Sequence, residues 1–460
     1  MDGDIRFGTD GWRGVIAKDF TFFNLGRVAT AYGHYLLERG GKRVVVGHDT
    51  RFQAKVFAEE AAGILAGMGL EVLLLPGPHP TPMLSFAVRH VGADGGLMLT
   101  ASHNPPQYLG VKLKGPYGGS ALPEEVKRVE ALIPKRPAEG RGKPEALEIR
   151  AAYYDHLKGL LDLEALARFP GLLYHDAMGG AGDSHLSAFF RHVGLNLEVR
   201  ELHNLPHPLF YGVNPEPLPK NLGTLLALMG PEKSPSFAVA TDGDGDRMAA
   251  VLPGGVFFNP HQVFAVLLRH LHKKGLSGLV VKNFAVSWIV DRLAEGLGLP
   301  VRTTPIGFKW ITEAFLREDV LIGGEESGGI GVKGHLPERD GLLNALLLLE
   351  SVAQTGLDLA DQFKEIEGMV GLTHAYDRLD LAVPTAGLLE KLREPRPLAG
   401  LSPAGLEDLD GVKWVYGEAW ILFRLSGTEP LLRIYAEATE EKTVGALLRE
   451  AEALVRSLIP

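Results

Sequence analysis

The sequence predicts an α/β fold in which three successive α/β units precede a smaller unit of α+β type. Short apolar runs of strand length alternate with segments of helical length through residues 1–370, a pattern typical of parallel βα units. Beyond residue 371, several strand-like runs accompany two helical segments and favour an α+β unit. At about 150 residues per domain, the length of 460 residues alone points to about three compact units. We expect the units at 1–145, 146–253, 254–370 and 371–460.

Each expected element follows from this alternation. In the first unit we expect strands at 43–47, 71–75 and 95–100 and helices at 52–69 and 81–91, before a Pro-, Gly- and charge-rich linker at 134–150. In the second we expect strands at 172–176, 196–201 and 237–241 and a helix at 183–193. In the third we expect strands at 279–283, 301–304 and 320–323 and helices at 261–273, 287–297, 308–317 and 342–353. In the fourth we expect strands at 376–383, 411–415, 419–424 and 432–436 and helices near 388 and at 442–458.

Composition excludes several classes of function. The absence of cysteine excludes disulfides, iron–sulfur clusters, cysteine-ligated zinc and thiol nucleophiles. A net charge of −9 argues against a nucleic-acid partner, and an anionic substrate must be gathered by a local cluster of cations. No apolar run approaches the length of a membrane span, so no membrane partner is expected. The acidic start at residues 1–4 does not resemble a secretory signal, and we expect a cytoplasmic protein.

The first unusual loop, Thr-Ala-Ser-His-Asn-Pro at residues 100–105, directly follows an apolar strand. Ligands of parallel α/β sheets bind at the carboxyl ends of strands, so a reactive group is well placed here. The Ser102 hydroxyl beside His103 could serve as a nucleophile or a phosphate carrier. The alternative is a turn built from Ser, Asn and Pro. The loop lacks the G-x-S-x-G pattern of α/β-hydrolases, which disfavours acyl transfer.

The second loop, Asp-Gly-Asp-Gly-Asp-Arg at residues 242–247, follows another apolar strand. Three carboxylates this close repel one another unless a cation lies among them, and oxygen ligands suit Mg²⁺ or Ca²⁺. An EF-hand is excluded because its sixth and twelfth positions hold Arg247 and Pro253 in place of Gly and Glu. The alternative is a solvated acidic turn, which has no need of such regular spacing.

Two further loops carry groups that suit a sugar phosphate. Gly-Gly-Glu-Glu-Ser-Gly-Gly at 323–329 offers carboxylates and a hydroxyl to a ligand rich in hydroxyls, with a plain surface turn as the alternative. The adjoining G-x-G-x-x-G at 329–334 is not a dinucleotide motif, because Pro337 follows and no helix begins there. Arg-Leu-Ser-Gly-Thr-Glu-Pro at 424–430, followed by Arg433, offers guanidiniums and a backbone nest to a phosphate. A hairpin turn is the alternative for this last loop.

Together and in this order, the four loops resemble those of the α-D-phosphohexomutase superfamily, which includes phosphoglucomutases and phosphomannomutases. The resemblance covers nearly the whole chain, from Phe-Gly-Thr-Asp-Gly-Trp-Arg-Gly at 7–14 to the arginine loop near residue 424. It implies three similar α/β domains with mixed sheets and a C-terminal α+β domain, arranged around a central cleft.

The resemblance also implies roles for matching residues. Ser102 would carry the phosphoryl group as phosphoserine, and a Mg²⁺ ion would be held by Asp242, Asp244, Asp246 and an oxygen at Ser102. The residues that face the reacting phosphate or move protons would be Arg13, His103, Lys112 and Arg247. The residues that bind the substrate would be Lys309, Glu325, Ser327, His335, Arg339 and, around its non-reacting phosphate, Arg424, Ser426, Gly427, Thr428 and Arg433.

The implied reaction is an isomerisation by two phosphoryl transfers. Phosphoserine converts a hexose monophosphate to a bisphosphate, which turns over in the cleft and returns its other phosphate to Ser102. Glucose 1,6-bisphosphate would be the intermediate and activator, a hexose monophosphate the substrate, and the enzyme a monomer or dimer. Such transfers require charge neutralisation and in-line positioning, and the remote phosphate would orient the reacting end.

Two points stay open on the sequence alone. Arg339 stands where some phosphoglucomutases have lysine, and an arginine is a poor proton shuttle, so Lys112, His103 and His335 are candidates for the general base. Phosphoglucosamine mutases usually have Gln before the Ser of the sugar loop and His after its Gly. The Glu-Glu-Ser-Gly-Gly found here therefore favours glucose phosphates, with mannose phosphates as a second substrate. The alternatives are a phosphoglucosamine mutase, a non-catalytic phosphosugar-binding protein and a metal-dependent phosphatase.

Overall fold

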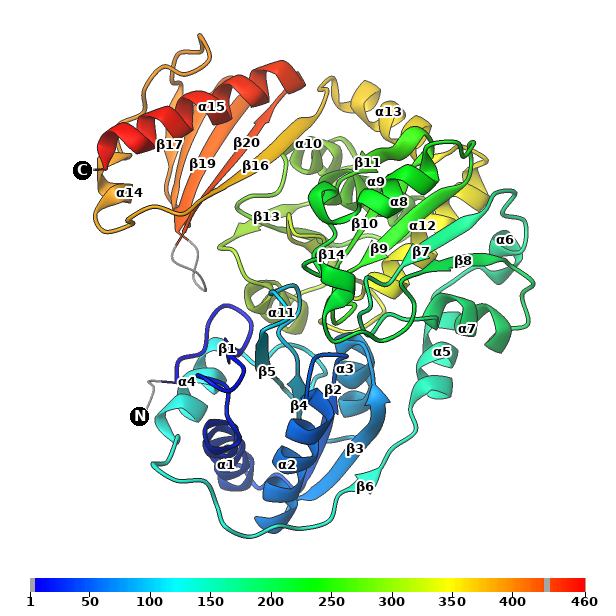
Figure 1. The fold of residues 1–460 in the computed structure, drawn as a ribbon. Coiled ribbons are helices and arrows are strands. Elements are labelled where there is room, and N and C mark those ends of the chain that lie inside the picture. Colours follow the sequence, from blue (N-terminus) through cyan, green and yellow to red (C-terminus); the bar gives the residue numbers. More distant parts are fainter. Residues whose placement is uncertain (1–4, 426–430, 460) are drawn as a thin grey trace.

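The computed structural model describes residues 5–425 and 431–459, which form four sheets with their own helices (Figure 1). We call the four parts domains 1 to 4 in chain order and define each by its sheet. The first three sheets combine parallel and antiparallel pairs, whereas the fourth is antiparallel. This arrangement confirms the predicted fold class.

Domain 1 has a six-stranded sheet in the order β1-β5-β4-β2-β3-β6. Its strands are β1 (Trp12–Val15), β2 (Arg43–His48), β3 (Glu71–Pro78), β4 (Gly95–Leu99), β5 (Tyr108–Lys114) and β6 (Glu145–Ala146). Its helices are α1 (Phe22–Glu38), α2 (Ala54–Gly67), α3 (Thr81–His90) and α4 (Pro123–Ala131). The strand β2 is parallel to both β3 and β4, whereas β5 is antiparallel to β4 and β1.

The central strand β2 is buried on both faces. Val44 and Val46 pack into one core with α1 and α2, while Val45 packs into a second core that includes α3. Successive side chains of a strand point to opposite faces, so an unbroken run of valines indicates a strand between two helical layers. Because β2 and β4 are parallel neighbours, the polar loops that follow them lie side by side at one edge of the sheet.

Domain 2 has a five-stranded sheet in the order β11-β10-β9-β7-β8, in which β7 is parallel to β8 and β9 and the remaining pairs are antiparallel. Its strands are β7 (Leu173–Asp176), β8 (Val199–Leu202), β9 (Phe237–Thr241), β10 (Met248–Leu252) and β11 (Val256–Phe258). Its helices are α5 (Arg150–Lys158), α6 (Leu163–Leu166), α7 (His185–His192) and α8 (Gly223–Met229), with 3₁₀ turns η1 (Phe210–Gly212), η2 (Pro219–Asn221) and η3 (Pro253–Gly255).

Domain 3 has a four-stranded sheet in the order β13-β12-β14-β15. The strand β12 is parallel to both of its neighbours, β13 and β14, whereas β15 is antiparallel to β14. Its strands are β12 (Leu279–Asn283), β13 (Val301–Thr304), β14 (Val320–Gly324) and β15 (Ile330–Val332). Its helices are α9 (Pro260–Lys273), α10 (Trp288–Gly296), α11 (Phe308–Arg317), α12 (Gly341–Thr355) and α13 (Leu359–Val370).

Domain 4 has an antiparallel sheet in the order β16-β20-β19-β18-β17, and α15 lies across one face of it (Figure 1). Its strands are β16 (Ala375–Leu381), β17 (Gly405–Glu407), β18 (Val412–Tyr416), β19 (Ala419–Leu425) and β20 (Leu432–Ala438). Its helices are α14 (Leu388–Lys391) and α15 (Glu441–Leu458). The change from mixed to antiparallel pairing matches the α+β type expected here.

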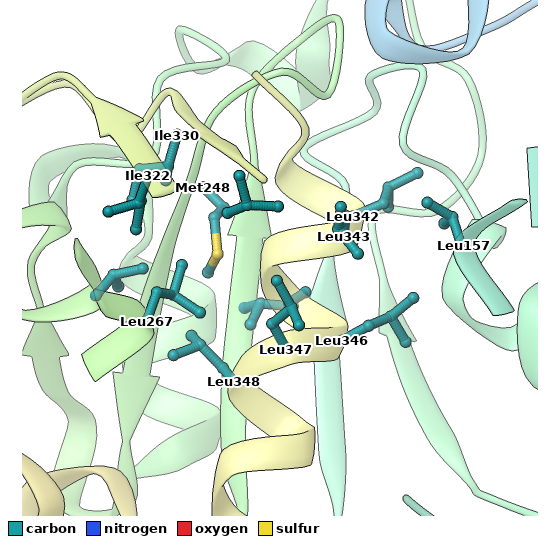
Figure 2. Close-up of a cluster of buried hydrophobic side chains, with 14 of the residues drawn as sticks. Leu157, Met248, Leu267, Ile322, Ile330, Leu342, Leu343, Leu346, Leu347 and Leu348 are labelled. Carbon is teal, nitrogen blue, oxygen red and sulfur yellow. The ribbon is translucent and has the colours of Figure 1, made fainter. Parts of the chain in front are cut away.

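The leucine-rich helix α12 packs domains 2 and 3 together. It is buried from Gly341 to Val352, and Figure 2 shows its leucines among Leu157, Met248 and Ile322, which come from α5, β10 and β14. A helix that is apolar on all sides is a core element. Among the described residues, no single helix is long and apolar enough to cross a membrane; one pair, α12 with α13, passes that test together but is bent by 81°.

Candidate active site

The Ser102 loop follows β4 and lies against domain 2. Ser102 is buried and has a φ of +50°, in the left-handed region that residues other than glycine rarely adopt. Its backbone N–H donates to Thr100 Oγ1 at 2.8 Å, and its Oγ donates to Asp242 Oδ2 at 2.7 Å. The loop therefore aims the serine hydroxyl at the acidic loop of the next domain.

The acidic loop joins β9 to β10 and gathers its three aspartates. One carboxylate oxygen from each of Asp242, Asp244 and Asp246 lies within 4.8 Å of the others, and all three residues are buried. Thr81 Oγ1 donates to Asp244 Oδ2 at 2.5 Å. Asp244 Oδ1 and Asp246 Oδ1 have no hydrogen-bond partner among the described residues. Buried oxygens without donors, in an oxygen-only set, fit a hard divalent cation.

The pKa values of Asp242 and Asp244 are shifted in opposite directions. Burial, together with the charges of Asp244 and Asp246, raises the pKa of Asp242 well above its ordinary value. Burial also acts to raise the pKa of Asp244, but Lys112 outweighs it and the pKa lies below its ordinary value. Three clustered carboxylates thus retain a need for positive charge that a divalent cation would meet.

Two buried cations connect this loop with domains 1 and 3. Lys112 Nζ lies 2.9 Å from Asp10 Oδ2, 2.8 Å from Asp244 Oδ2 and 2.6 Å from Asp246 Oδ2. Burial would lower the pKa of Lys112, but these carboxylates raise it, so the ammonium keeps its proton. Arg339 Nη2 lies 2.6 Å from Asp10 Oδ2 and 2.9 Å from Asp246 Oδ2, and its guanidinium faces the ring of Phe308. Ion pairs from Lys112 of domain 1 and Arg339 of domain 3 thus hold the acidic loop of domain 2 in place.

A pocket lined from all four domains adjoins the two loops. Its lining comes from distant parts of the chain, and the pocket corresponds to the expected central cleft. Its lining is Thr9, Asp10, Arg13, His103, Glu216, Arg247, Ile306, Gly307, Phe308, Glu325, Glu326, Ser327, Arg339, Arg378, Arg424 and Arg433. The six arginines in this lining form the local cluster of cations that an anionic substrate requires in a chain of net negative charge.

Domain 4 supplies three of those arginines. Arg424 and Arg433 are paired residues of the neighbouring strands β19 and β20. Arg424 Nε lies 3.1 Å from Asp410 Oδ1. The remaining predicted members of this phosphate loop, Ser426, Gly427 and Thr428, lie outside the described residues.

The predicted sugar loop follows β14 and faces the same pocket. The N–H of Gly307 donates to Glu325 Oε1 at 3.0 Å, so the loop before α11 fixes this carboxylate. Asn283 Nδ2 donates to Glu326 Oε2 at 2.6 Å. Ser327 lines the pocket beside them. The loop therefore offers two buried carboxylates and a hydroxyl to a ligand.

Comparison with known proteins identifies the family. Its domain models match the chain in order: phosphoglucomutase/phosphomannomutase α/β/α domain I at residues 4–139, domain II at 151–255, domain III at 259–368 and the C-terminal domain at 383–454. The chain belongs to the phosphoglucomutase/phosphomannomutase family. It is therefore a phosphohexomutase, which is an isomerase.

Individual relatives of this phosphohexomutase carry more than one name. It is 30% identical to the phosphoglucomutase/phosphomannomutase of Thermococcus kodakarensis and 31% identical to the phosphoglucosamine mutase of Limosilactobacillus reuteri, each over 95% of both chains. A crystal structure from Thermus thermophilus, provisionally named a phosphomannomutase, is 60% identical and covers 99% of this chain and 100% of its own, with a TM-score of 0.93.

Two of the described residues predicted to bind the substrate, His335 and Lys309, are not part of the lining of the arginine-rich pocket. The imidazole of His335 lies between two other side chains. Its Nε2 is 2.9 Å from Asp340 Oδ2, and its Nδ1 is 2.9 Å from His156 Nε2. Lys309 lines a neighbouring pocket that shares Thr9 and Asp10 with the first. His103, in contrast, lines the arginine-rich pocket. Its pKa is lowered well below the usual value by burial and then by Arg247 and Arg13, which leaves a neutral imidazole.

Sequence reasoning missed three residues of the phosphohexomutase pocket. Asp10 lies within the Phe-Gly-Thr-Asp-Gly motif at 7–11, but its partners Lys112 and Arg339 come from distant elements. Glu216 and Arg378 form an ion pair of 3.4 Å between domains 2 and 4. Glu216 lies in the Asn-Pro-Glu-Pro loop at 214–217, which is a detectable signal, whereas Arg378 is one of several charged residues in β16 and carries none.

Proposed function

We propose that this phosphohexomutase interconverts glucose 1-phosphate and glucose 6-phosphate, with mannose phosphates as a second substrate, through a phosphoserine at residue 102. The observation that carries the proposal is the contact of Ser102 Oγ with Asp242 Oδ2 at 2.7 Å, beside a pocket with six arginines. A hydroxyl next to clustered carboxylates and cations suits phosphoryl transfer, in which charge must be neutralised and the groups aligned.

Residues of this chain can account for the phosphoryl group and the proton in each transfer. In the first, the bond between phosphorus and Ser102 Oγ breaks as a bond to the sugar hydroxyl oxygen forms. One ring nitrogen of His103 accepts the proton of that hydroxyl. His103 Nδ1 lies 3.4 Å from Ser102 Oγ, so the imidazole can return a proton to the serine oxygen. The second transfer reverses these changes at the other end of the sugar, and no proton or phosphate is lost to solvent.

Asp242, Asp244 and Asp246, together with an oxygen at Ser102, are the residues that would hold a Mg²⁺ ion. The fit is supported by Asp244 Oδ1 and Asp246 Oδ1, which have no hydrogen-bond partner among the described residues, and by the oxygen-only donor set. The ion would supply positive charge to the phosphoryl oxygens when bound. The chain itself contributes Arg13 and Arg247, which line the same pocket, and Lys112 on the aspartates.

The remote phosphate is assigned to Arg424 and Arg433, which domain 4 contributes to the pocket lining. Binding of the substrate's non-reacting phosphate would orient its reacting hydroxyl toward the phosphoryl group, which lowers the barrier to transfer. A metal-dependent phosphatase has no need of such a second cradle. The proposal therefore favours a mutase in which the bisphosphate stays bound while its two ends exchange.

A second candidate is the interconversion of glucosamine phosphates. It is favoured by the carboxylates of Glu325 and Glu326, which could pair with the ammonium of an amino sugar, and by the name of the L. reuteri relative. Parallel measurement of kcat/KM on glucose, mannose and glucosamine 1-phosphates decides between the two. The first proposal expects glucose 1-phosphate to be preferred, and a preference for glucosamine 1-phosphate would contradict it.

A further inference from the structure

The polar segment His-Asp-Thr-Arg at residues 48–51 begins at the last residue of β2 and has no role in the proposed chemistry. The side chain of Arg51 is nevertheless fully buried, and its guanidinium donates to backbone carbonyls. Nη2 donates to the carbonyls of Ser102 at 2.7 Å and Asn104 at 2.6 Å, and Nη1 donates to those of Pro105 at 2.9 Å and Tyr108 at 3.0 Å. One side chain thus holds four carbonyls of the loop that carries the serine.

Asp49 supports this arrangement from the other side. Its Oδ2 lies 3.3 Å from Arg51 Nε and accepts a hydrogen bond from Thr100 Oγ1 at 2.6 Å. Thr100 Oγ1 in turn accepts the N–H of Ser102 at 2.8 Å. The carboxylate of Asp49 is therefore linked to both backbone polar groups of Ser102, to the carbonyl through Arg51 and to the N–H through Thr100.

This support is directed at a strained residue. Ser102 has a φ of +50°, which is unfavourable for a residue with a Cβ and persists only where the surroundings enforce it. The ring of Phe210, from domain 2, covers the guanidinium with its centroid 4.8 Å from Arg51 Cζ. A lysine could not replace this contact set, because a planar fork of five N–H donors reaches several carbonyls and an ammonium is a point donor.

We propose that Arg51, oriented by Asp49, is a positioning residue for phosphoryl transfer. It holds the Ser102 loop in the conformation that directs Oγ to Asp242 and to the reacting phosphate. The inference rests on the proposed role of Ser102 as the phosphoryl carrier. Arg51 acts through the backbone of the loop, so its loss should affect the transfer step more than substrate binding.

The test compares three variants with the wild-type protein. Arg51→Lys keeps the charge but removes the fork, and Thr100→Val removes the hydroxyl between Asp49 and the Ser102 N–H while keeping the side-chain shape. Arg141→Lys is the matched control, because Arg141 is exposed and donates to the carbonyls of Ala138, Glu139 and Gly140, far from the site. The readouts are kcat, KM, the folded fraction by circular dichroism, and transfer of labelled phosphate from glucose 1,6-bisphosphate to Ser102.

For Arg51→Lys and Thr100→Val we expect kcat and the rate of labelling to fall by about 100-fold while KM changes by less than about threefold, as for a displaced nucleophile. For Arg141→Lys we expect wild-type kinetics. A further variant, Arg51→Ala, should regain part of its kcat in dilute guanidinium ion and none in methylammonium, because only a planar fork can re-form the contacts.

The outcomes separate this inference from the proposed function. If wild-type protein is labelled on Ser102 and both variants keep its rate, the inference is wrong and the proposed function stands. The inference also fails if activity falls only in proportion to the folded fraction, or if KM alone rises. Label on another residue in the wild-type protein would overturn the proposed function, and this inference with it.

Discussion

Ser102 Oγ donates a hydrogen bond to Asp242 Oδ2 at 2.7 Å, although the two residues are 140 positions apart and belong to different domains. The contact joins the loop after β4 to the loop after β9. It exists only because the carboxyl ends of these strands face each other across the boundary of domains 1 and 2. The proposed nucleophile and the proposed cation site are thus assembled by domain packing.

The closeness of the two loops makes Gly243 sensitive to substitution. A Cβ at this position would lie 2.5 Å from the Ser102 carbonyl oxygen, so one of the loops must shift in Gly243→Ala. We expect a folded protein whose kcat falls by about 100-fold, because a displacement of about 1 Å at the nucleophile has that cost. Gly223→Ala is the control, since nothing lies within 4 Å of the Cβ it would add. Unchanged kcat in Gly243→Ala would show that the loops need not touch.

Removal of Lys112 should destabilise the protein when no metal is bound. In Lys112→Gln, Asp10, Asp244 and Asp246 lose their shared cation, and breaking a buried ion pair on one side costs about 3–5 kcal/mol. Thermal unfolding in the presence of a chelator measures the loss. Lys55→Gln, which removes an exposed ion pair of 3.9 Å with Glu59, should change the midpoint little. Equal midpoints for the two variants would contradict the proposed electrostatic role of Lys112.

Divalent cation should stabilise the folded chain through the three aspartates. We expect Mg²⁺ to raise the unfolding temperature of the wild-type protein and to have no such effect on Asp244→Asn, because ligand binding to the native state shifts unfolding by mass action. Asp319→Asn, which alters an exposed carboxylate paired with Lys333, should respond like the wild type. A Mg²⁺ response that survives in Asp244→Asn would place the cation elsewhere.

Much of this site could be predicted because its chemistry lies in short contiguous loops. The serine loop, the acidic loop and the sugar loop each follow a strand that the sequence shows plainly, and the structure has them at the ends of β4, β9 and β14. A nucleophile or carboxylate cluster at a strand end is a local signal. The sequence does not show which residues will pair across a domain boundary. Glu216 and Arg378 form such a pair although they are 162 positions apart.

The strand β5 illustrates the same limit for the fold. Tyr-Leu-Gly-Val-Lys-Leu-Lys at 108–114 contains two lysines and is not among the expected strands, yet both Lys112 and Lys114 are buried. Their partner carboxylates, Asp246 and Glu338, come from domains 2 and 3. Burial of a lysine depends on such long-range pairing, which composition and periodicity do not reveal. The family resemblance implied that His335 binds the substrate, and in the structure its ring nitrogens lie beside Asp340 and His156.

Arg424→Ala should weaken substrate binding more than it slows transfer. Loss of a guanidinium on the non-reacting phosphate removes a charge-assisted contact, and we expect KM to rise by about 10-fold or more. Steady-state kinetics on glucose 1-phosphate provide the measurement. Arg393→Ala is the control within domain 4, because Arg393 is half-exposed and pairs with Asp408 and Glu390 away from the pocket. A fall in kcat at constant KM would argue against a role in holding the remote phosphate.

The junction of domains 3 and 4 should depend on pH through Glu437. Burial acts to raise the pKa of this carboxyl, but hydrogen bonds from His374 and Ser287 hold it at about 2. A depressed carboxyl pKa contributes stability above the unfolded value near 4.5, and that contribution disappears as the pH falls toward 2. Glu437→Gln should therefore lower the free energy of unfolding by about 3 kcal/mol at pH 7 and by progressively less below pH 4.5. A difference between the two proteins that is constant with pH would refute this assignment.

The most direct test of the account is the site of phosphate transfer. Wild-type protein and Ser102→Ala would be incubated with glucose 1,6-bisphosphate that carries isotopically labelled phosphate, then digested and mapped by mass spectrometry. The account predicts label on Ser102 alone in the wild type, none in Ser102→Ala, and a loss of mutase turnover by at least about three orders of magnitude in that variant. Label on any other residue, or near-normal turnover in Ser102→Ala, would contradict it.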